Sequence, residues 1–199
     1  MLNVVIFGAP GSGKGTQSEK LIERYGLHHI STGEVLRNHI ARGTQLGKVA
    51  DQYISQGQLI PDELMIEVLA DELDSNGEKA AKGVIFDGFP RTIPQARALS
   101  KMLEDRGTAV HAVVGLDVPE DRLVERMIKR GQQSGRADDN IDTIKKRLDV
   151  YHRQTSPLKE YYIGEGKYLN IDGDGDVDRI FGDIAGSLDK ISETAAENK

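Results

Sequence analysis

The stretch VVIFGAPGSGKGTQ, residues 4–17, decides the fold, because an apolar run, a glycine-rich turn, a lysine and the start of a helical pattern follow one another in it. The glycines let backbone N–H groups close around phosphate oxygens at a helix N-terminus, and Lys14 can reach the outer phosphates of a nucleotide. The hydroxyl that usually follows the lysine is displaced by Gly15 to Thr16. The sequence therefore predicts a strand, a phosphate loop and a helix, with the loop built on Gly8, Gly11, Gly13 and Lys14.

The rest of the chain alternates between short apolar runs and longer segments of helical period. The apolar runs are residues 2–7, 84–86, 110–116 and 168–171, and Pro94, Pro119 and Pro157 mark helix starts. Such alternation predicts an α/β fold, a P-loop three-layer sandwich around a central parallel sheet.

Two segments interrupt the alternation. Between Ser31 and Ile60 the strand pattern disappears, and two short helical patterns split by Gly43 predict an inserted helical subdomain. The polar run GQQSGRADDN, residues 131–140, predicts a surface loop between two arginine-rich helices. The polar residues 193–199 are expected to fray.

Composition narrows the class of protein. The 199 residues suffice for one globular unit, and 38% hydrophobic with 29% charged residues excludes the disordered and collagen-like classes. The absence of cysteine excludes disulfides, thiolate catalysis and cysteine-rich zinc sites, so no zinc is expected. A net charge of −6 offers no basic surface to nucleic acid or to a membrane. With neither a basic leader nor the roughly 18 apolar residues of a membrane span, a cytoplasmic protein is expected.

A carboxylate closes a second strand, VIFDG at residues 84–88. In P-loop proteins Mg²⁺ is held by an acidic residue at the carboxyl end of a parallel strand beside the phosphate loop. Asp87 is therefore predicted to hold Mg²⁺, through water.

Arginines recur in the second half of the chain. Arg122, Arg126 and Arg130 share one helical face, where like charges repel by roughly 0.2–0.5 kcal/mol per pair unless an anion offsets them. Guanidinium groups suit the charge of a transferring phosphoryl group, so Arg126 and Arg130 are predicted to meet phosphate. For Arg122 the alternative is a solvated helix face with surface ion pairs to Glu125 and Asp121.

No general base stands out, since the five histidines do not build a site. One reaction needs none, because a nucleoside monophosphate with a second pKa of about 6 is already an anionic nucleophile at neutral pH. Positioning and charge neutralisation would then suffice for catalysis.

The acidic run IDGDGDVD, residues 171–178, does not fit a calcium loop. Counted from Asp172, the sixth position is Val177 rather than glycine and the twelfth is Asp183 rather than glutamate. A glycine-rich loop after a strand is better placed to line a nucleotide base with backbone groups.

Four motifs resemble the adenylate kinase family over nearly the whole chain. They are GAPGSGKGT from Gly8, STGEVLR from Ser31, DGFPRT from Asp87 with Gln95 beyond it, and SGRADDN from Ser134. The resemblance implies reversible transfer of the terminal phosphoryl group of Mg·ATP to AMP, giving two ADP, in adenine nucleotide homeostasis. ATP, AMP and ADP are the implied partners, Mg²⁺ enters with ATP, and a monomer is expected.

The resemblance also implies a division of the chain. Residues 1–30, 61–130 and 141–199 would form the core, residues 31–60 an AMP-binding subdomain and residues 131–140 a lid. Closure of the lid over the nucleotides is a motion for which this family is a standard example. The lid is too short for the hairpin of the long bacterial form and lacks its metal-binding cysteines, so this chain resembles the short-lid form.

Site residues follow from the matched motifs. Those implied to bind ATP are Gly11, Ser12, Gly13, Lys14, Gly15, Thr16, Arg130 and, by its backbone at the adenine, Gly175. Those implied to bind AMP are Thr32, Arg37, Gln58, Leu59, Ile60, Gly88, Phe89, Pro90, Arg91, Gln95, Arg136 and Arg147. Those implied in catalysis are Lys14, Arg91, Arg126, Arg130, Arg136 and Arg147.

Two other functions share parts of this pattern. A UMP/CMP kinase has the same architecture but would be expected to lack the threonine of STG and the glutamine after FPRT, so Thr32 and Gln95 favour adenine. A P-loop nucleotide-switch binding protein would be expected to carry an Asn-Lys-x-Asp run, which this sequence lacks.

Overall fold

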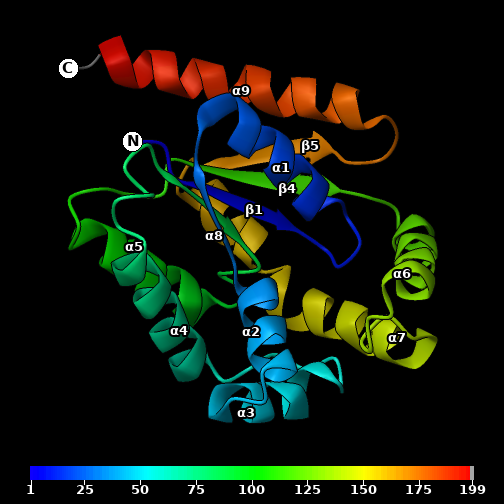
Figure 1. The fold of residues 1–199 in the computed structure, drawn as a ribbon. Coiled ribbons are helices and arrows are strands. Elements are labelled where there is room, and N and C mark those ends of the chain that lie inside the picture. Colours follow the sequence, from blue (N-terminus) through cyan, green and yellow to red (C-terminus); the bar gives the residue numbers. More distant parts are fainter. Residues whose placement is uncertain (198–199) are drawn as a thin grey trace.

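The computed structural model describes residues 1–197, and within them one five-stranded sheet has only parallel neighbours (Figure 1). The strand order is β2-β3-β1-β4-β5, so the predicted α/β sandwich around a parallel sheet is confirmed. The strands are β1 (Val4–Gly8), β2 (His28–Ser31), β3 (Val84–Asp87), β4 (Ala112–Asp117) and β5 (Tyr168–Asp172).

Helices cover both faces of the sheet. Helices α1 and α9 pack on one face, and α4, α5 and α8 pack on the other (Figure 1). The helices are α1 (Lys14–Tyr25), α2 (Thr32–Ala41), α3 (Gln45–Ile54), α4 (Asp62–Ser75), α5 (Ile93–Glu104), α6 (Glu120–Ser134), α7 (Ile141–Val150), α8 (Leu158–Gly164) and α9 (Val177–Glu197). A π-helical turn, Tyr151–Thr155, continues α7.

Strand β1 shows why the sheet needs both layers. Val4 and Ile6 pack in the cluster under α1 and α9, whereas Val5 and Phe7 pack in the cluster on the opposite face. Full burial of each such side chain contributes about 1.5–3 kcal/mol. Because both faces are covered, the strand is a continuous apolar run rather than an alternating one.

Strand β2 is missing from the strands that the sequence predicts. Its four residues, HHIS, are short and mostly polar, and only Ile30 among them is buried. Parallel pairing with β3, from His28↔Val84 to Ser31↔Asp87, holds it at the sheet edge. A strand of this kind forms through its neighbours rather than through its own hydrophobic pattern.

Helices α2 and α3 occupy the segment in which an inserted helical subdomain is predicted. Each begins at a hydroxyl cap, with Ser31 and Thr44 accepting hydrogen bonds from backbone N–H groups. Gly47 lets the two helices approach closely, because a Cβ there would stand 2.1 Å from the carbonyl oxygen of His39. The pair lies beyond the sheet, at the bottom of Figure 1.

Helix α6 is longer than the sequence predicts. The expected loop begins at Gly131, yet α6 continues through Ser134 and ends at Gly135, whose φ is +64° and whose N–H donates to the Gly131 carbonyl. A left-handed glycine terminates a helix, whereas Gly131 is tolerated inside it. The segment between α6 and α7 is therefore 135–140, and Asn140 caps α7.

Helix α9 carries the chain to the end of the described residues. Of the segment 193–199 expected to fray, the backbone is helical as far as Glu197, and residues 198–199 lie outside the described part. Within residues 1–197 no helix is both long and apolar enough to cross a membrane.

Candidate active site

The carboxyl ends of three strands bring the predicted motifs to one edge of the sheet. Ile6 of β1 and Ser31 of β2 both stand beside Asp87 of β3 in the strand register. Gly8, the last residue of β1, pairs with Leu116 of β4. Loops that follow parallel strands at such an edge form the usual ligand crevice of α/β proteins.

The phosphate loop leads directly into α1. Gly13 caps the helix with φ +95°, a left-handed conformation that glycine adopts at little cost. The Lys14 ammonium lies over the loop and donates to the carbonyls of Gly8 at 3.0 Å and Ala9 at 3.1 Å. Burial lowers the pKa of Lys14 to about 8, helped by nearby arginines and opposed by Asp87. An anion at this helix N-terminus would stabilise the charged lysine.

Asp87 lies beside this lysine and contacts a histidine that the sequence analysis missed. Its Oδ2 is 3.3 Å from Nε2 of His29. Burial alone would raise the pKa of Asp87, but the hydrogen bond from His29 and the charges of Lys14, His29 and Arg91 outweigh it and lower that pKa. The contact depends on the register of β2, the strand whose pattern is weakest.

The donor set at Asp87 fits Mg²⁺ rather than a metal held by protein ligands alone. Among the side chains that the structure describes, residues 1–192, no group of three or more His, Cys, Asp or Glu could hold a metal ion. Mg²⁺ keeps several waters and takes one or two carboxylates together with substrate phosphate oxygens. One ionised carboxylate beside a phosphate loop meets that requirement.

A pocket lies next to the phosphate loop, between the sheet edge and helices α2, α3, α5 and α7. The predicted site residues that line it are Lys14, Thr32, Arg37, Gln58, Leu59, Ile60, Gly88, Pro90, Arg91, Gln95 and Arg147. The sequence analysis missed its apolar wall, which includes Leu36, Ile54, Met65 and Tyr151. Apolar residues at helical spacing give no signal that separates a pocket wall from the core.

Two buried aspartates hold the arginines at the α6–α7 connection. The Asp139 side chain is 0% exposed, and its oxygens accept from Arg130 Nε at 2.6 Å, Arg130 Nη2 at 2.8 Å and Arg147 Nη1 at 2.7 Å. Asp138 pairs with Arg147 at 3.1 Å. Burial would raise the pKa of Asp139, but the contacts with Arg130 and Arg147 outweigh it and lower that pKa.

Three further arginines gather here without an ion-pair partner within 4.0 Å among the described side chains of residues 1–192: Arg37, Arg91 and Arg136. Burial and neighbouring guanidinium groups lower the pKa of Arg91 to about 10, and the pKa values of Arg37 and Arg136 are lowered for the same reasons. Asp138 and Asp139 are occupied by other arginines, so the side chain of Arg136 stays unpaired. Such mutual repulsion is offset when a polyanion binds.

Gln95 is fixed at the base of the pocket by both ends of its amide. The oxygen accepts from the backbone N–H of Arg91 at 2.8 Å, and the nitrogen donates to Asp62 Oδ1 at 2.9 Å. The same Asp62 oxygen accepts from Thr92 at 2.8 Å. Asp62, from α4, is a second residue that the sequence analysis missed, since its partners lie about thirty positions away.

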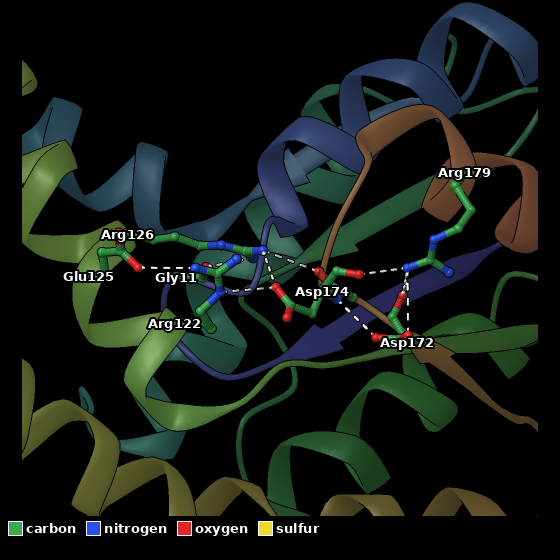
Figure 2. Close-up of polar contacts among 8 residues, drawn as sticks. Gly11, Arg122, Glu125, Arg126, Asp172, Asp174 and Arg179 are labelled. Atoms are coloured by element: carbon green, nitrogen blue, oxygen red, sulfur yellow. Dashed lines mark hydrogen bonds and ion pairs between the residues drawn. The ribbon is translucent and has the colours of Figure 1, made fainter.

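Two arginines of α6, Arg122 and Arg126, lie between the phosphate loop and the loop that follows β5 (Figure 2). Arg126 donates to the carbonyls of Gly11 at 3.5 Å and Gly173 at 3.4 Å. Arg122 pairs with Glu125 and with Asp174, each at 3.4 Å, so it does form the surface ion pair given as the alternative for it.

The remaining predicted residues do not line the pocket. Phe89 is 1% exposed and packs in the core. The others outside the lining are Gly11, Ser12, Gly13, Gly15, Thr16, Asp87, Arg126, Arg130, Arg136 and Gly175.

Comparison with known proteins gives consistent relatives. The family model described as adenylate kinase matches residues 6–167. A protein of Bacteroides fragilis named Adenylate kinase is 64% identical over 191 residues, which is 96% of this chain and 100% of that protein. Proteins of the same name from Phocaeicola vulgatus and Porphyromonas gingivalis are 63% and 50% identical over 96% and 98% of this chain, and each match spans 100% of the relative.

Proposed function

This chain belongs to the adenylate kinase family and transfers phosphoryl groups between ATP and AMP, and from that premise we propose how its residues divide the work. The observation that carries the proposal is one pocket lined by Lys14 of the phosphate loop together with Arg91 and Arg147. The Lys14 ammonium and two guanidinium groups thus border the same space. That arrangement suits two phosphate chains meeting end to end.

The site that we propose for the donor, ATP, consists of the phosphate loop and its surroundings. Backbone N–H groups from Gly11 to Thr16 and the N-terminus of α1 would hold the ATP phosphates. Lys14 would move from the Gly8 and Ala9 carbonyls to the outer phosphates, since it exchanges two neutral acceptors for an anion. Gly175, with φ +111°, would offer its backbone to the adenine.

The site that we propose for the acceptor, AMP, is the pocket itself. Arg37, Arg91 and Arg147 would bind the AMP phosphate, because they line the pocket and repel one another without an anion. Gln95 and Thr32 would read the adenine edge from the pocket floor. Both ends of the Gln95 amide are held, so the group is already oriented before a base arrives.

Phosphoryl transfer then needs positioning and charge rather than a base. An oxygen of the AMP phosphate attacks the terminal phosphorus of ATP, the bond from that phosphorus to the β-phosphate oxygen breaks, and two ADP result. Charge spreads over the ATP phosphates and the transferring group, and the cations proposed to stabilise it are Lys14, Arg91, Arg126, Arg130, Arg136 and Arg147. Arg136 is suited to this role because Asp138 and Asp139 are already paired with other arginines.

Adenylate kinases use ATP with a divalent metal. We propose that Asp87 holds Mg²⁺ through water, since its lowered pKa keeps the carboxylate ionised and it lies beside Lys14. When bound, Mg²⁺ neutralises charge on the phosphates. His29 would keep the Asp87 carboxylate oriented through the contact between its Nε2 and Asp87 Oδ2.

The moving parts and the setting are also proposals. Residues 31–60 would close over AMP, and residues 131–140 would close over both nucleotides, with Gly135 as one hinge. Closure excludes water, to which the phosphoryl group would otherwise be transferred. We propose that the protein is cytoplasmic, since the reaction uses the ATP, ADP and AMP of the cell. We also propose a monomer, since one chain contains both nucleotide-binding sites.

A coupled assay of ADP formation with AMP, UMP, CMP and GMP as acceptors tests this assignment. The expected result is a kcat/KM for AMP at least about a hundredfold above that for the pyrimidine nucleotides, as for a site built to hydrogen-bond one base. Equal or better use of UMP or CMP would instead assign the pocket to a pyrimidine acceptor.

A further inference from the structure

One carboxylate holds two arginines on the donor side of the phosphate loop. Asp174 Oδ1 lies 3.4 Å from Arg126 Nη2 and 3.4 Å from Arg122 Nε. Arg126 also donates to the carbonyls of Gly11 and Gly173, so its guanidinium spans from the phosphate loop to the loop between β5 and α9 (Figure 2). A donor nucleotide seated on this side of the loop would meet the same guanidinium.

The loop that carries Asp174 is stabilised by hydrogen bonds from α9 and within the loop itself. Arg179 of α9 donates to the carbonyls of Asp174 at 2.6 Å and Asp172 at 3.3 Å (Figure 2). The Asp172 carboxylate accepts from the N–H of Asp174 at 3.1 Å. The Asp174 backbone is therefore held in place, and its carboxylate can meet Arg126 without ordering a mobile segment.

The contact between Asp174 and Arg126 is also weak enough to exchange. Their side chains are 32% and 35% exposed, and the 3.4 Å separation is long for a charge-assisted hydrogen bond. Arg126 has two carbonyl acceptors besides the carboxylate, so these can orient it when the carboxylate is replaced. A phosphate chain with several charges can thus take the place of the single carboxylate.

We propose that Asp174 is a positioning residue of the donor site, an internal anion that binds Arg126 in turn with the donor phosphates and so limits the affinity for ATP. This rests on the proposed function, because it takes Arg126 as a ligand of ATP. It also accounts for Arg122 and Arg126 sharing one helical face: Asp174 offsets their repulsion whenever the donor does not. Removal of its charge frees Arg126 for the donor.

Calorimetric titration of the full chain with ATP, and separately with AMP, tests the proposal. Asp174→Asn is expected to bind ATP about two- to fivefold more tightly than wild type, the range that an exposed ion pair spans, and to bind AMP unchanged. Glu125→Gln is the matched control, because it removes the same charge from an ion-pair partner of Arg122, whereas the ion pair of Arg126 is with Asp174. The gain should appear in Asp174→Asn alone, should shrink at high salt, and should vanish in an Arg126→Ala background.

The outcomes separate the two proposals. If Arg126→Ala weakens ATP binding but Asp174→Asn equals wild type, equals Glu125→Gln or binds ATP less tightly, Asp174 is not an internal competitor and only this inference is overturned. If Arg126→Ala binds ATP as wild type does, the donor role of Arg126 is wrong and the inference is overturned with it.

Discussion

Asp139→Asn tests how far the buried carboxylate between α6 and α7 controls both stability and catalysis. The Asp139 side chain is 0% exposed and receives three charge-assisted hydrogen bonds of 2.6–2.8 Å from Arg130 and Arg147. Asparagine keeps the shape but removes the charge, and its NH₂ group then faces a guanidinium donor. Water cannot replace the lost acceptor, because the side chain has no exposed surface.

The expected loss follows from that geometry. Breaking a buried ion pair by removing one partner costs about 3–5 kcal/mol. Arg130 is 33% exposed and Arg147 is 17% exposed, so both can recover some hydration and the lower end applies, about 3 kcal/mol. For a chain of this size that corresponds to a Tm lower by roughly 6–12 °C. The same variant should lower kcat by roughly tenfold to a hundredfold, since two proposed catalytic arginines lose their orientation.

Urea unfolding and steady-state kinetics at pH 7 measure both effects, with Asp149→Asn as the control. Asp149 lies on α7 as well, but its carboxylate is 59% exposed and pairs with Arg153 on the surface. That control should lose less than about 1 kcal/mol and keep its kcat. A free energy of unfolding within about 1 kcal/mol of wild type for Asp139→Asn would refute the reasoning. Wild-type stability should also fall as pH drops below about 4, through the lowered pKa of Asp139, and the variant should lose less there.

Three further predictions rest on other parts of the site and fold. Lys14 has a pKa of about 8 without ATP, so its charge is present below that pH and lost above it. The Kd for ATP should therefore be about tenfold higher at pH 9 than at pH 7. A Kd that does not change with pH in wild type, or that rises equally in Lys14→Met, would contradict this. Gln95→Ala should lower kcat/KM for AMP at least about tenfold and that for UMP much less, whereas an equal fall for both would assign Gln95 to bracing Arg91. Gly47→Ala should destabilise by about 1–3 kcal/mol in thermal unfolding, because its Cβ would meet the His39 carbonyl, whereas Gly186→Ala, where a Cβ has open space on α9, should be neutral or stabilising.

The sequence alone determined those features of this protein that depend on residues close together in the chain: the phosphate loop, the apolar strands and the contiguous motifs. The apolar run followed by a glycine turn and Lys14 predicts a strand, a phosphate loop and a helix, because the apolar strand and the positive φ of Gly13 depend on residues that are neighbours in the chain. Parallel strands that are covered on both faces are continuous apolar runs, a pattern that is visible within a few neighbouring residues. The α/β class could therefore be predicted from these runs and the helical segments between them. The four motifs were visible because each is contiguous in the chain.

Only the tertiary structure decided which of these residues act on one another. Strand β2 has almost no pattern of its own, and it is the pairing of Ser31 with Asp87 that puts His29 beside the Asp87 carboxylate. Asp174 meets Arg126 across 48 positions of sequence, and Asp62 meets Gln95 across 33. The lowered pKa of Lys14 likewise comes from burial and from charges on other elements. Hydrogen bonding and electrostatics depend on distance in space, and only packing of the helices on the sheet fixes that distance for residues far apart in the chain.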